Sequence, residues 1–201
     1  MIPNSGANNP KHSLMTRIAH MGLALVIILQ LLTSLVMQGP GRTQPGDFLF
    51  QLHQYGGLTA LFFTFLFWMS VMLRRRGTPL MQLIPWFSVT RRNAFWQDAC
   101  IYYEALKNFQ LPDYNESAPF ASAVHGLGLL LMSLMAITGT VFYVMASLGM
   151  ATTLPAELLL GVHTTFGNLV WAYLIGHAGF ALLHHYADDL GILNIGSLHK
   201  S

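Results

Sequence analysis

The sequence alternates long apolar stretches with short polar segments. Four stretches contain no Lys, Arg, Asp or Glu, and they cover residues 18–37, 48–73, 118–148 and 158–186. A helix needs about 20 apolar residues to cross a bilayer, and each stretch meets that length. We therefore predict an all-α membrane protein, a four-transmembrane-helix bundle.

The flanking segments define the limits of this bundle. Residues 1–16 are rich in Asn, Gly and Pro and predict a disordered tail, and residues 187–201 predict a C-terminal tail. The bundle domain is expected over residues 17–186. The apolar run after Arg17 is too long for the core of a secretory signal and lacks a cleavage motif.

A fifth helix is predicted in the segment between the second and third spans. Its apolar positions recur at helical spacing over residues 91–110, and they are Phe95, Ala99, Tyr102, Leu106 and Phe109. Either this is a cytoplasmic amphipathic helix lying on the membrane interface, or it is a cap that packs on its own bundle. The sequence leaves both interpretations open.

Composition supports the membrane assignment. Of the 201 residues, 53% are hydrophobic and 9% charged, whereas soluble domains carry about 25% charged residues. A net charge of +2 gives a nucleic-acid partner no electrostatic basis. The single cysteine, Cys100, excludes an internal disulfide and a cysteine-ligated iron–sulfur cluster within this chain.

The basic residues are distributed asymmetrically. In a four-span chain, one side of the membrane receives Lys11, Arg17, Arg74, Arg75, Arg76, Arg91, Arg92, Lys107 and Lys200. The other side receives only Arg42. Because basic loops stay in the cytoplasm, we predict a bacterial inner membrane protein with both termini cytoplasmic.

Histidines are the candidate chemical groups. Seven of the nine lie in or at the ends of the spans: His20, His53, His125, His163, His177, His184 and His185. Polar residues within a bilayer are costly and usually functional. In the fourth span, His163 and His177 are 14 residues apart, which is close to four turns, so both point the same way at levels ~21 Å apart.

Topology supplies a partner at each level. His20 lies near the cytoplasmic start of the first span, at the level of His177. His53 lies near the opposite end, at the level of His163. Two facing imidazoles fill both axial positions of a haem, and a haem of that kind works in electron transfer. We therefore expect two haem b groups, bound without covalent links because no Cys-x-x-Cys-His motif is present.

The remaining histidines allow several roles. His125 lies at about the depth of His20, where it is a rival ligand, a propionate contact or a packing residue. We favour a role other than ligation. His184 and His185, at the cytoplasmic end of the last span, suit either snorkelling at the interface or a quinone or proton-exchange site.

Several motifs are similar to those of a known family. They are RIAH at residues 17–20, HQYGG at 53–57, HGLGLLLMSLMAITGTVF at 125–142 and HTTFGNLVWAYLIGHAGFALLHH at 163–185. On these, the chain resembles the bacterial cytochrome b561 / nickel-hydrogenase cytochrome b family of four-helix di-haem membrane proteins. Met21, where a Trp often follows the first ligand, and the weakly basic C-terminal tail depart from the pattern.

The resemblance implies specific roles for residues and partners. It implies haem b ligation by His20, His53, His163 and His177, and quinone as electron partner in a respiratory chain. Arg17 is a candidate for a propionate contact on the cytoplasmic side, and snorkelling at a helix start is the simpler account of it. Members are either subunits working with a redox enzyme or cytochrome c subunit, or stand-alone superoxide:quinone oxidoreductases. The long middle loop resembles the partner-associated branch more.

Two functions from other classes compete with electron transfer. A metal-ion permease would use histidine ligands, but it would also be expected to carry carboxylates within the spans, and these spans have none. A structural assembly subunit would need no cofactor.

Overall fold

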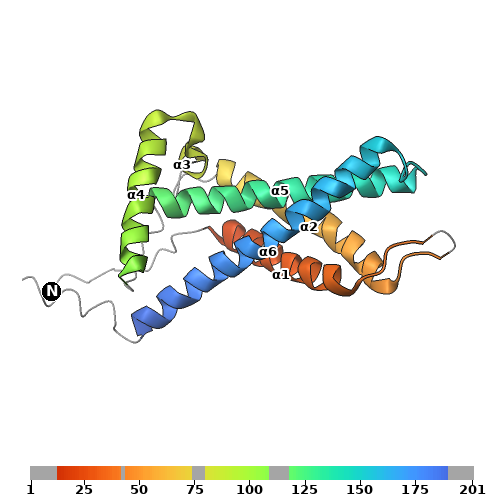
Figure 1. The fold of residues 1–201 in the computed structure, drawn as a ribbon, viewed down its shortest axis with the longest axis horizontal. Helices are drawn as coiled ribbons and strands as arrows, with labels where there is room; N and C mark the ends of the chain where they lie inside the picture. Colours follow the sequence, from red (N-terminus) through yellow and green to blue (C-terminus); the bar gives the residue numbers. More distant parts are fainter. Residues whose placement is uncertain (1–12, 42–43, 74–79, 109–117, 190–201) are drawn as a thin grey trace, which may run out of the picture.

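The four-span prediction is confirmed by the computed structural model, which describes residues 13–41, 44–73, 80–108 and 118–189. Its elements are α1 (Leu14–Val36), α2 (Phe48–Leu73), α3 (Leu80–Leu83), the 3-10 helix η1 (Pro85–Phe87), α4 (Val89–Lys107), α5 (Pro119–Ser147) and α6 (Leu154–Asp189) (Figure 1). In this described part of the chain, four helices, α1, α2, α5 and α6, are long and apolar enough to cross a membrane. No β-strand occurs in those ranges.

Two helices extend beyond their predicted ends. α1 begins at Leu14 rather than residue 18, because the Ser13 hydroxyl accepts a hydrogen bond from the Thr16 amide at 3.2 Å and caps the helix. His20 consequently lies in the second turn of α1. α6 continues to Asp189, three residues past its predicted end. The predicted tails lie almost entirely outside the described residues.

The spans form two antiparallel hairpins. α1 is joined to α2, whose start is capped by the Asp47 carboxylate accepting from the Phe50 amide at 2.7 Å. α5 is joined to α6 through Gly149, whose backbone φ of 75° lies in the left-handed region that favours glycine. Both connections lie at one end of the bundle, here called the hairpin end. The opposite end carries α4 and is called the α4 end (Figure 1).

Polar side chains join neighbouring helices at the α4 end. Thr16 of α1 and Ser70 of α2 are hydrogen-bonded through their buried hydroxyls. The Trp68 indole N–H of α2 donates to the Ser133 hydroxyl of α5 at 2.9 Å. Such bonds between helices are favoured in lipid because water is absent as a competing partner. They join α2 to α1 and to α5, and α6 crosses α2 obliquely in the view of Figure 1.

The outer surface of the bundle is apolar. Large side chains on all four spans are exposed, among them Leu25 (64%), Phe65 (62%), Ile137 (53%) and Ile175 (68%). A protein that exposed this much apolar surface to water would tend to aggregate. Lipid therefore covers the surface of the spans, as the low charge of the sequence predicts.

The segment between α2 and α5 folds against the start of α5. Phe95 and Tyr102 of α4 pack on Phe120, with ring centres 5.6 and 5.1 Å apart. The Asp98 carboxylate accepts from the Phe120 amide at 2.9 Å and thereby caps α5 from a different helix. Burial, and secondarily the Asp98 carboxylate, raise the pKa of Tyr102.

This packing bears on the two interpretations of the middle helix. The observed helix starts two residues before the predicted 91 and ends at Lys107, and two of its predicted stripe residues contact the bundle. Trp96, Ile101 and Tyr103 of α4 are exposed. Leu106 of the predicted stripe is exposed, and Phe109 lies outside the described residues. Part of the stripe therefore packs on the bundle, and both interpretations of the helix stay predictions.

A substitution at Gly126 tests the contact between α3 and α5. A Cβ at Gly126 would lie 1.8 Å from the Leu83 carbonyl oxygen, which is backbone and cannot rotate away. We expect Gly126→Ala to lower the thermal unfolding midpoint in detergent by roughly 5 °C through overpacking. Gly161→Ala is the control, because its Cβ meets nothing within 4 Å. An unchanged midpoint for Gly126→Ala would contradict the packing.

Candidate functional site

One facing pair of histidines lies near the hairpin end. His53, from the second turn of α2, faces His163 of α6, with ring centres 6.3 Å apart and ring planes at 89°. Both rings are partly buried. The structure therefore brings together the two residues that topology predicts at this level.

A second facing pair lies toward the α4 end. His20 of α1 and His177 of α6 have ring centres 6.3 Å apart at 58°. The ring of Tyr173, one helical turn before His177, stacks on it at 5.4 Å and 9°. His125 of α5 meets the same ring edge-on at 5.3 Å. This site therefore contains three histidines, whereas the sequence predicts two ligands.

The ring separations can be compared with what an iron ion requires. An imidazole nitrogen binds a transition metal at about 2 Å and lies about 1.2 Å from the ring centre, so two rings on opposite sides of one iron have centres roughly 6.4 Å apart. Both predicted pairs are at 6.3 Å. The His125–His177 separation of 5.3 Å is roughly 1 Å shorter. The two predicted pairs therefore have the ring separation that an iron held between two imidazoles requires, and His125 and His177 are closer together than that.

A cavity surrounds the hairpin-end pair. Its volume is about 380 Å³, within the range of small-molecule and cofactor sites. His53 and His163 both line it, among mainly apolar side chains. A Cβ at Gly139 would lie 2.9 Å from Cε1 of His163, so this glycine gives the ring its space. The site thus combines two histidines with a mainly apolar lining, which suits a largely apolar cofactor held by imidazoles.

One polar group in this cavity is left without a partner. The Gln30 side-chain amide nitrogen is buried and has no hydrogen-bond acceptor in the described part of the chain. The Gln30 amide passes close over Gly56, because a Cβ added at Gly56 would lie 2.2 Å from the Gln30 amide nitrogen. Since buried donors in folded proteins are normally paired, Gln30 fits a bound group that offers an acceptor atom.

The two pairs are separated by the apolar core. Leu23 and Leu31 of α1, Met132 of α5 and Val170 of α6 form one buried cluster. Val170 is seven residues from each of the two α6 histidines. The bundle therefore contains two sites at different levels with packed hydrocarbon between them.

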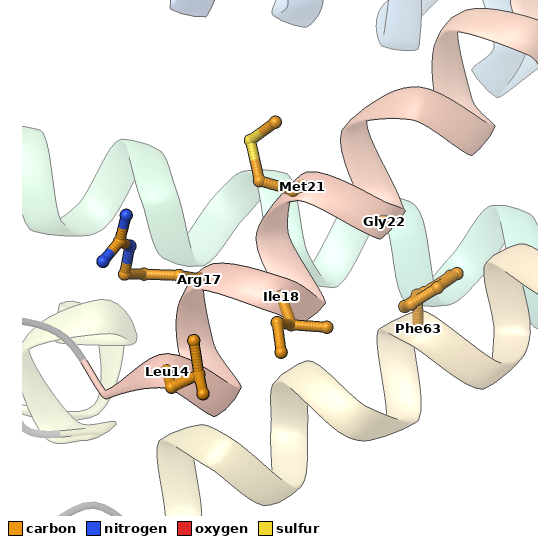
Figure 2. A pocket seen from close by; sticks show the side chains of 6 residues that line it. All are labelled: Leu14, Arg17, Ile18, Met21, Gly22 and Phe63. Atoms are coloured by element: carbon orange, nitrogen blue, oxygen red, sulfur yellow. The ribbon is translucent and has the colours of Figure 1, made fainter.

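Arg17 lies at the α4 end, three residues before His20, with an exposed side chain. It borders an open groove of about 410 Å³ lined by Leu14, Arg17, Ile18, Met21, Gly22 and Phe63. Figure 2 shows Arg17 and Met21 leaving α1 on the side away from α2. The position is compatible with a contact to an anionic group beside His20, and that role stays a prediction.

His184 of α6 is placed differently from a side chain that snorkels at the interface. His184 is buried, and its Nδ1 lies 2.9 Å from the Phe180 carbonyl oxygen one turn earlier. Because a carbonyl only accepts, this Nδ1 carries the proton. The His185 side chain lies outside the described residues. The quinone and proton-exchange roles of His184 and His185 stay predictions.

Three neighbours of the predicted ligands were not predicted. Thr33 and Thr138 each place a hydroxyl within 3.1 Å of a histidine Nδ1 at the hairpin end, and Gln30 lines the same cavity. Their signal in the sequence is that they are polar residues inside apolar spans. Periodicity alone does not indicate which face of a helix they occupy.

A family model described as prokaryotic cytochrome b561 matches residues 11–195, which include all four spans and both histidine pairs. Neither a curated protein nor a solved structure gives a significant match to the chain.

Proposed function

Because this chain belongs to the prokaryotic cytochrome b561 family of haem b membrane proteins, we propose that it is a di-haem electron carrier across the bilayer. In this proposal His53 and His163 hold one haem b, and His20 and His177 hold the other. The electrons pass between a redox partner and the quinone pool of a respiratory chain.

The observation that carries the proposal is the repeated ring separation. Two histidine pairs, contributed by three different spans, each have centres 6.3 Å apart. The two α6 members are ~21 Å apart along the helix axis, a large part of the ~30 Å hydrocarbon core. A pair at each of two levels is the arrangement that carries electrons through a membrane in two short steps.

The residues determine what kind of chemistry this arrangement permits. A bound haem supplies an iron that alternates between two oxidation states and carries one electron. His53 with His163, and His20 with His177, would hold such a group from both sides and would leave it no site for oxygen. Buried side chains such as Met132 and Val170 keep water out of the space between the levels.

The partners are the finer part of the proposal. The quinone, being apolar, reaches the protein through lipid, and the second partner is a redox enzyme or a cytochrome c subunit. The α3–α4 segment supports docking at the α4 end, because it covers the start of α5 while Trp96 and Tyr103 remain exposed.

Transmembrane electron transfer is tested in sealed vesicles. Purified protein is reconstituted with ferricyanide inside, and dithionite, which does not cross lipid, is added outside. We expect the trapped ferricyanide to be reduced with wild-type protein and reduction to fall to the protein-free rate with His163→Ala. A wild-type rate equal to that of empty vesicles, with both haems bound, would contradict the proposal.

A further inference from the structure

We propose that Thr33 and Thr138 are positioning residues that fix both imidazoles of the hairpin-end pair with Nε2 toward the iron and lower that haem's reduction potential. The inference rests on the proposed ligation by His53 and His163. It concerns how the protein distinguishes one haem level from the other.

Each threonine contacts one ring of the pair. The Thr33 hydroxyl of α1 lies 3.0 Å from Nδ1 of His53 on α2. The Thr138 hydroxyl of α5 lies 3.1 Å from Nδ1 of His163 on α6. In both hairpins the threonine comes from the first helix and the histidine from the second. The same contact is therefore built twice, in two different parts of the chain.

The direction of these hydrogen bonds follows from the other contacts of the hydroxyls. Thr33 Oγ1 lies 2.8 Å from the Leu29 carbonyl oxygen and 3.0 Å from that of Gln30. Carbonyl oxygens only accept, so the single hydroxyl proton is directed to them. The oxygen must then accept from the histidine, and Nδ1 of His53 carries the ring proton.

Thr138 has the same environment. Its Oγ1 lies 2.7 Å from the Leu134 carbonyl oxygen and 3.2 Å from that of Met135. By the same reasoning, Nδ1 of His163 is the donor. In each neutral imidazole this leaves the lone pair on Nε2, the nitrogen that is then available to bind iron.

Burial makes both contacts effective. The exposed fractions of Thr33 and Thr138 are 4% and 5%, so water does not compete for the histidine protons. An imidazole that donates its second N–H to an acceptor is held in orientation and becomes a more basic ligand. A more basic ligand stabilises ferric iron relative to ferrous iron. The two threonines should therefore act on the hairpin-end haem in the same direction.

The test is a potentiometric titration of purified Thr33→Val and Thr138→Val proteins. Valine keeps the shape of threonine and removes the oxygen. At the wild-type midpoint potential, we expect the ratio of reduced to oxidised haem to rise by up to about tenfold for one haem. That haem should be the component missing from His53→Ala. Low-spin electron paramagnetic resonance signals of the same component should shift.

Thr64→Val is the matched control. Thr64 is 3% exposed, and its hydroxyl has no hydrogen-bond partner among the described residues. We expect this variant to leave both components unchanged. Thr33→Ser and Thr138→Ser keep the oxygen and should titrate like the wild type, which separates the hydrogen bond from a packing effect.

The outcomes separate this inference from the proposed function. Two bound haems in both valine variants, with neither component moved, would overturn the threonine role and leave the ligand assignment intact. A wild-type protein without haem would overturn the proposed function itself. If a valine variant fails to fold, Thr33→Ala and Thr138→Ala take its place, because they also remove the oxygen and should move the titration in the same direction.

Discussion

Replacing either His53 or His163 with alanine should remove one haem, and the same haem in both cases. The two rings face each other at 6.3 Å from different helices, so neither holds an iron alone. Haem content should fall from about two to about one per chain. The pyridine haemochrome assay, normalised to protein, measures this ratio.

The double variant makes the prediction sharper. Because both residues serve one site, His53→Ala with His163→Ala should lose no more haem than either single variant, which is the non-additivity expected of a shared partner. Gln51→Ala is the control, since Gln51 is exposed on α2 two residues before His53 and should keep both haems. Loss of different spectral components in the two single variants would refute the pairing.

His20→Ala and His125→Ala should have opposite outcomes. Both residues lie beside His177, but the centre of the His20 ring is 6.3 Å away and that of His125 is 5.3 Å away. Only the first separation accommodates an iron with bonds of about 2 Å to each nitrogen. His20→Ala should remove the α4-end haem completely, whereas His125→Ala should keep about two haems per chain.

The absorption spectra of these variants distinguish ligation from contact. A neighbour of His177 that is not a ligand alters the spectrum of the bound haem slightly and does not abolish it. Full haem content in His20→Ala together with a missing haem in His125→Ala would show that His125, not His20, is the partner of His177.

The sequence predicts most of the fold because lipid imposes strict length and charge requirements on a span. The run from 48 to 73 was predicted to the residue, and the 14-residue spacing in the last span predicts two levels on one face. Topology then predicts which histidine lies opposite each of these. The ring distances agree with those pairs because antiparallel hairpins fix the order of depths along each helix.

The remaining features depend on three-dimensional contacts that periodicity does not encode. The early start of α1 depends on one hydroxyl, that of Ser13. The cap on α5 comes from Asp98, 22 residues before the amide it accepts from. The contacts of Thr33 and Thr138 depend on how far each helix is rotated about its axis. A one-residue rotation of about 100° would direct either hydroxyl elsewhere.

The most direct test of the central claim is the haem content and spin state of the purified wild-type protein from haem-replete cells. We expect about two non-covalent haem b groups per chain, both low-spin with two imidazole ligands, in reduced-minus-oxidised and electron paramagnetic resonance spectra. A protein that is folded yet colourless, or one that holds high-spin haem with an open axial position, would contradict the account.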